Sequence, residues 1–188
     1  FGSSILAILI FIFPTLFGEG YESIKVLSQN DPGRLLENTL FSDFRNNSWV
    51  LLLFVGCTMM VKVFATGITL SSGGNGGNFA PSLFLGSYVG FFFSKFLNLT
   101  GLTKLPISNF TMVGMAGILS GLFHAPLTAI FLIAEITGGY SLMIPLMIVS
   151  SISFAISKRF EKHSMDVKNL AKKGHAFTSN KDTNILST

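Results

Sequence analysis

Long apolar runs, separated by short groups of glycine, proline and polar residues, dominate the pattern along the chain. The run at residues 48–70 exceeds the roughly 20 residues that a membrane-spanning helix needs. Ser48 is its predicted N-cap, and Trp49 is predicted to lie at a membrane interface. Shorter apolar runs follow at residues 79–97, 107–123, 126–137 and 141–157. Their unequal lengths predict an all-α membrane fold with short, broken and tilted helices.

The region before residue 48 has a different pattern. Residues 1–13 form an apolar run that ends at Pro14 and is too short to cross a bilayer alone. Residues 21–27 could form one or two helical turns, and residues 29–47 form a charged connection with a short predicted helix at 34–41. Because the chain starts inside an apolar run and without methionine, we interpret it as a piece of a longer protein.

Composition and charge support a membrane location. Hydrophobic residues make up 49% of the chain and charged residues only 12%. Up to residue 157, six basic and six acidic residues balance, whereas seven basic and three acidic residues follow, so the net charge of +4 resides in the tail. We therefore predict a membrane domain at residues 1–157 and a basic cytoplasmic linker at 158–188. The basic pI reflects this topology, and no nucleic-acid partner is expected.

Several classes of function find no support in the residues. The single cysteine, Cys57, lies in an apolar run and is expected to be a small buried hydrophobe, without a disulfide framework or metal cluster. The glycine run at residues 73–77 lacks a glycine three positions after Gly76 and lacks a following Lys-Ser/Thr pair, so it fits neither common nucleotide-binding loop. No nucleophile–base pair is recognisable, and neither an enzyme nor a cofactor is predicted.

The stretch at residues 71–81 is the strongest candidate for chemistry. It is rich in glycine, lies between two apolar runs, and ends where a new helix is predicted to start, at about Asn78 or Phe79. The first N–H groups of a helix lack internal partners and carry partial positive charge, so this turn could bind an anion without a charged side chain. Pro81 suits an early helical position. The alternative is that the glycines serve close helix packing only.

Two charged residues lie within apolar runs. Lys62, in the predicted spanning helix, must face protein or water, either attracting anions toward the glycine turn or forming a purely structural contact. Glu135 lies close to the end of its predicted helix, and a structural role is favoured there. The sequence leaves the two interpretations of Lys62 open.

An ordered set of motifs resembles one family. It comprises Ser71-Ser72-Gly73-Gly74, Gly77-Asn78-Phe79-Ala80-Pro81, Gly114-Met115-Ala116-Gly117, Ala125-Pro126-Leu127-Thr128, and Glu135-Ile136-Thr137-Gly138-Gly139-Tyr140 with Pro145. Their order and spacing resemble the second half of CLC chloride channels and chloride/proton antiporters, over roughly residues 1–159. The resemblance implies an inverted-repeat fold, chloride as ligand and substrate, a homodimer in a lipid bilayer, and a missing N-terminal half of the same subunit.

The resemblance also implies a set of site residues. In the family, the amides of the Gly-x-Phe-x-Pro stretch and a tyrosine hydroxyl hold the central anion. Carried over to this chain, these are the backbone N–H groups of Asn78 and Phe79, with Gly77, Ala80 and Pro81 shaping the turn, and the hydroxyl of Tyr140. From the residues alone, Tyr140 is more typical of an anchor at the membrane interface.

Some functional alternatives stay open at this stage. The gating and proton-relay glutamates of the family belong to its first half, so the sequence does not distinguish a voltage-gated channel from an antiporter. A rival interpretation is a non-transporting membrane assembly module. The resemblance places the protein in the plasma (inner) membrane, and many members continue beyond this point into CBS domains.

Overall fold

The computed structural model describes residues 2–18, 20–28, 32–36, 39, 47–74, 76–101, 103–137 and 140–172. Within these ranges the chain forms helices and no strand, which confirms the all-α prediction. The α-helices are α1 (Gly2–Ile12), α2 (Tyr21–Ser28), α3 (Ser48–Ser71), α4 (Phe79–Leu99), α5 (Ile107–Phe123), α6 (Pro126–Ile136), α7 (Met143–Phe160) and α8 (Met165–Lys172). The short 3-10 helices η1 (Pro14–Leu16), η2 (Pro32–Leu36) and η4 (Tyr140–Leu142) lie between them.

Most helix ends lie where proline, glycine or polar residues interrupt the apolar runs of the sequence. α5 has the predicted bounds because Pro106 precedes it and His124 ends it in the left-handed conformation, at a φ of 55°. α6 then starts at Pro126, whose ring suits the first helical turn. The N-cap predicted for α3 was wrong by one residue: Asn47, and not Ser48, accepts the N–H of Trp49, at 3.1 Å. The helix predicted at 34–41 overlaps η2, and its remainder lies mostly outside the described residues.

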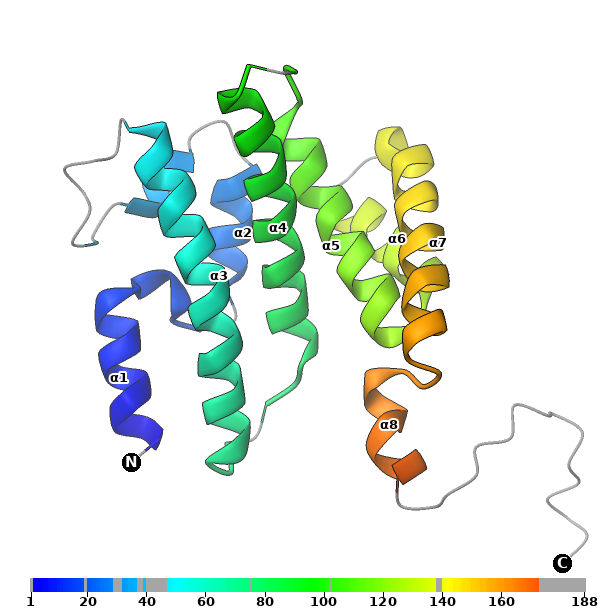
Figure 1. Cartoon of the computed structure of the whole chain (residues 1–188), viewed down its shortest axis with the longest axis horizontal. Helices are drawn as coiled ribbons and strands as arrows, with labels where there is room; N and C mark the ends of the chain where they lie inside the picture. The colour runs from blue at the N-terminus through cyan, green and yellow to red at the C-terminus, as the bar shows by residue number, and fades with distance from the viewer. Residues whose placement is uncertain are drawn as a thin grey trace, which may run out of the picture.

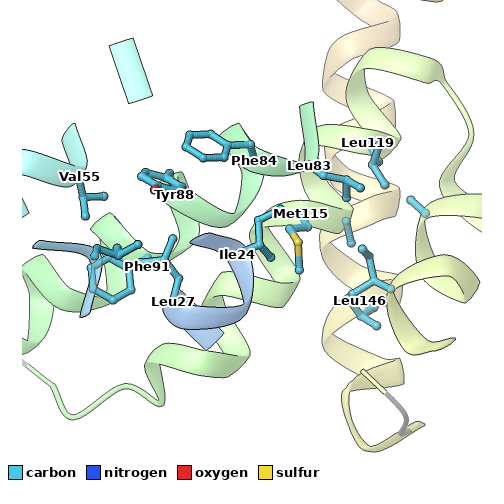
Figure 2. Packing of buried hydrophobic residues seen from close by; sticks show 14 of the residues in the cluster. Ile24, Leu27, Val55, Leu83, Phe84, Tyr88, Phe91, Met115, Leu119 and Leu146 are labelled. Carbon is cyan, nitrogen blue, oxygen red and sulfur yellow. The ribbon is translucent and has the colours of Figure 1, made fainter. Parts of the chain in front are cut away.

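α4 and α5 form the centre of the molecule, with α1, α2 and α3 on one side and α6 and α7 on the other (Figure 1). The core is built around the fully buried side chains of Phe84, Tyr88 and Phe91 on α4. Figure 2 shows residues of α2, α3 and α5 near them, and Leu146 of α7 on the far side of Met115. Burying such large aromatic side chains fixes the position of α4, and therefore of the glycine turn from which it starts.

Small residues let the central helices approach closely. An ideal Cβ on Gly90 would lie 2.1 Å from the carbonyl oxygen of Phe110, and one on Gly114 would lie 2.4 Å from that of Gly86. α5 meets α7 through hydroxyl groups as well, since Ser153 Oγ donates to the Gly117 carbonyl at 2.7 Å and Ser157 Oγ to the Gly121 carbonyl at 2.6 Å. Close contacts through small residues of this kind are common between membrane helices.

Two helical segments of the described chain, Ser48–Ser71 and Tyr140–Lys168, are long and apolar enough to cross a membrane. Much of their surface faces outward. Along α7 only Leu146 and Ser150 are buried, while its outer face carries exposed apolar side chains, namely Ile144, Met147, Ile148, Ile152 and Ile156. An apolar outer face of this kind is suited to lipid or to another membrane-embedded protein surface.

Candidate functional site

The glycine run begins with a helix stop at the end of α3. Gly73 adopts a φ of +83°, the left-handed region that favours glycine, and its N–H bonds the Leu70 carbonyl at 3.3 Å. The N–H of Gly74 bonds the Thr69 carbonyl at 3.0 Å, which completes a Schellman motif after the C-cap Ser72. The end of α3 thus satisfies the Thr69 and Leu70 carbonyls and turns the chain sharply toward α4.

The first N–H groups of α4 have no acceptor among the described residues. Its N-cap Asn78 is in the right-handed helical region, with a φ of −82°, and its side chain makes no capping hydrogen bond. The first intrahelical bond runs from the Ser82 N–H to the Asn78 carbonyl at 3.1 Å. The N–H groups of Phe79 and Ala80 bond to no other described residue, and Pro81 has none. Asparagine is among the best N-caps, so its failure to cap leaves this end of the helix as an open donor site.

These amides lie at a cavity of about 580 Å³. The turn contributes one wall through Gly76, Gly77, Phe79, Ala80 and Pro81. The other walls come from α1, from η1 and the start of α2, and from α3, which contributes Lys62, Thr66 and Thr69. The two threonine hydroxyls donate to carbonyls one helical turn back in α3. Among the described residues that line this cavity, Lys62 is the one with a cationic side chain.

Lys62 is held firmly in place. Its side chain is 5% exposed, and Nζ donates to the carbonyls of Leu16 and Gly18, each at 3.1 Å. The ammonium group also lies 4.9 Å from the centroid of the Phe84 ring, a favourable cation–π distance. No described acid pairs with it. These contacts support a structural role for Lys62. Because Lys62 also lines the cavity, its positive charge lies where it could attract an anion toward the glycine turn.

The other side of the same turn faces a second cavity, of about 400 Å³. Gly77 and Phe79 line both cavities, so this short stretch separates them. The second cavity is otherwise lined mainly by the α5–α6 corner, and the Phe79 ring lies 5.9 Å from that of Phe123. Its one charged lining residue among those described is Asp166, from the first turn of α8.

The structure does not bring Tyr140 to the turn. Tyr140 is 67% exposed on η4 and lines neither cavity. α6 runs away from the turn for 11 residues, about 16 Å at 1.5 Å per residue, so the segment that joins α6 to α7, which contains η4, lies at the opposite end of the bundle from the start of α4 (Figure 1). The predicted pairing of its hydroxyl with the Asn78 and Phe79 amides is therefore corrected. Its neighbours Gly138 and Gly139 lie outside the described residues.

Asp166 lines the second cavity beside the turn, a position that the sequence did not predict. The sequence assigned it to a polar tail, although the fold returns this part of the chain to the turn. α7 runs back over 18 residues, so α8 begins at the end of the bundle where α4 begins (Figure 1). The alternating directions of α4 to α7 were the signal that could have indicated Asp166.

Comparisons with known proteins identify the family of the chain. The family model described as "Voltage gated chloride channel" matches residues 1–158. The chain is 27% identical over 172 residues to "Voltage-gated ClC-type chloride channel ClcB" of Escherichia coli (strain SMS-3-5 / SECEC), covering 91% of this chain and 37% of that protein. It is 30% identical over 156 residues to "Chloride channel protein CLC-e" of Arabidopsis thaliana, covering 78% of this chain and 20% of the relative. The chain thus spans little more than a third of its bacterial relative and a fifth of its plant relative.

Proposed function

The chain belongs to the voltage-gated chloride channel family, and from this premise we propose that it carries chloride across a membrane as part of a longer protein. The observation that carries the proposal is the open N-terminus of α4, with the Phe79 and Ala80 amides beside a cavity that also holds Lys62. Hydrogen-bond donors without acceptors, next to a buried cation, suit a small anion.

The proposed binding of the anion is weak enough for transport. The amide groups at a helix N-terminus present partial charges, which bind an anion moderately and allow it to leave again. Asn78 contributes its backbone to the turn, while Gly77 keeps the space before the amides free. Ala80 and Pro81 complete the first turn of α4 and line the first cavity. Neither a cofactor nor an enzymatic reaction is part of the proposal.

We infer that the site lies in a membrane-embedded subunit. Family membership and the two apolar helical segments support a membrane location. The basic residues Lys158 and Arg159 in the last turn of α7 favour a cytoplasmic position for that helix end in the plasma (inner) membrane. The part of the relatives' length that this chain does not span would supply the rest of the subunit. The exposed apolar face of α7 suits the contact between two copies in a homodimer.

Substitution of Gly77 by valine tests the site in the full-length protein that contains this chain. An ideal Cβ on Gly77 would lie 4.0 Å from the Phe79 nitrogen and contact no other described atom within that distance. The variant should therefore fold but cover the amide donors. Losing hydrogen bonds to a charged group costs about 1.5–3 kcal/mol, so we expect chloride affinity measured by calorimetry to fall at least about tenfold.

The matched control is Gly67→Ala, because an ideal Cβ on Gly67 of α3 meets no described atom within 4 Å. Chloride affinity should be unchanged in this variant. If Gly77→Val yields folded protein with the chloride affinity of the unsubstituted protein, the turn is not the anion site.

A further inference from the structure

The glycine turn lies between two cavities of opposite charge. On one side the cavity of about 580 Å³ holds Lys62, and on the other the cavity of about 400 Å³ holds Asp166. Both cavities are lined by Gly77 and Phe79, so an anion at the Phe79 amide would have a cation on one side and a carboxylate on the other. The charge of Asp166 opposes the positive potential of the α4 N-terminus.

The local structure holds Asp166 in this position. The N–H groups of Val167 and Lys168 bond the Ser164 carbonyl, at 3.1 and 3.0 Å, and so form the first turn of α8. Lys168 pairs with Glu161, on the segment that joins α7 to α8. The nearest cation along the helix is therefore engaged elsewhere, and Asp166 forms no ion pair or hydrogen bond with the described residues. Asp166 is exposed and lines the second cavity.

We propose that Asp166 is an affinity-determining residue, whose negative charge opposes chloride at the amides of the Gly77–Phe79 turn and weakens anion binding from that side. The inference rests on the proposed function, because it concerns the same turn. A negative charge beside the amides lowers the affinity for an anion, and conduction requires that the anion leave as readily as it enters. Lys62 attracts the anion from the first cavity, and Asp166 favours its release from the second.

A simpler role for Asp166 predicts a different result. An acid in the first turn of a helix stabilises that helix through its dipole, by about 0.3–1 kcal/mol at an exposed position. If this were its only role, neutralising Asp166 would lower the stability of α8 and leave chloride affinity unchanged. The two roles therefore separate in a binding measurement that is accompanied by a measurement of thermal stability.

The experiment measures chloride binding by calorimetry in the full-length protein, comparing Asp166→Asn with the unsubstituted protein. We expect Asp166→Asn to bind chloride about tenfold more tightly, equivalent to about 1.4 kcal/mol. Asp166→Glu, which keeps the charge, should bind as the unsubstituted protein does. Raising ionic strength with potassium gluconate should narrow the difference, because salt screens a solvent-exposed carboxylate over about 8–10 Å. Asp166→Ser replaces Asp166→Asn if the latter does not fold.

Glu135→Gln is the matched control, since Glu135 is an exposed acid of α6 that lines neither cavity. It should leave chloride affinity unchanged. Equal chloride affinity in Asp166→Asn and in the unsubstituted protein would overturn the role of Asp166 while the proposed function stands. Absence of chloride binding from the unsubstituted protein and from Asp166→Asn alike would instead contradict the proposed function itself.

Discussion

Replacing Gly90 by alanine is expected to disrupt the packing of α4 on α5 and to lower the stability of the protein by about 3 kcal/mol, at the upper end of the usual range for overpacking. The added Cβ would lie 2.1 Å from the Phe110 carbonyl oxygen and 2.8 Å from its carbonyl carbon. Both are backbone atoms, so no side-chain rotation can relieve the overlap, and the two helices must separate. The core around Tyr88 and Phe91 would then lose contacts as well.

The change is measured as the thermal midpoint of the detergent-solubilised full-length protein, followed by gel filtration of the heated sample. Gly67→Ala provides the comparison, since alanine is favoured over glycine in a helix by about 0.5–1 kcal/mol and an ideal Cβ there meets no described atom within 4 Å. A thermal midpoint for Gly90→Ala as high as that for Gly67→Ala would show that the close approach of α4 and α5 is wrong.

Lys62→Met is expected to weaken chloride binding by about tenfold or more. Two unit charges about 8 Å apart interact by about 2 kcal/mol at the effective dielectric constant of about 20 that suits protein sites. The substitution removes the ammonium group from the wall of the first cavity and leaves the Leu16 and Gly18 carbonyls without their donor. Both changes make the cavity less favourable for an anion, so we expect a higher Kd for chloride in calorimetry.

Two further variants separate charge from structure at this position. Lys62→Arg keeps a cation that can donate to both carbonyls, and it should retain most of the chloride affinity. Lys95→Met removes a cation from α4 outside both cavities and should leave the Kd unchanged. A folded Lys62→Met protein with unaltered chloride affinity would limit Lys62 to its structural contact with the Leu16 and Gly18 carbonyls.

The sequence was most informative where glycine and proline interrupt apolar runs. Pro106 and Pro126 mark the starts of α5 and α6, and Gly73 marks the turn after α3, because each of these residues restricts or permits a particular backbone conformation. A donor site at the N-terminus of α4 could be predicted in the same way, because residues 73–81 contain a helix end and a helix start close together.

Contacts between distant parts of the chain could not be predicted from the sequence in this way. The carbonyl partners of Lys62 lie 46 and 44 residues away, so the sequence could not decide how its side chain is held. Asp166 lies beside the turn and Tyr140 does not, because the direction of each helix decides which end of the bundle a residue occupies. A motif of neighbouring residues carries no such information about the remote end of a helix.

Chloride flux is the measurement that tests the account most directly. The full-length protein would be reconstituted in liposomes under a chloride gradient, with chloride and external pH followed together. We expect chloride flux that falls in Gly77→Val, while movement of protons against their gradient would distinguish an antiporter from a channel. A folded protein that carries no chloride, or whose flux is unchanged by Gly77→Val, would contradict the assignment of the α4 turn as the anion site of a transporting protein.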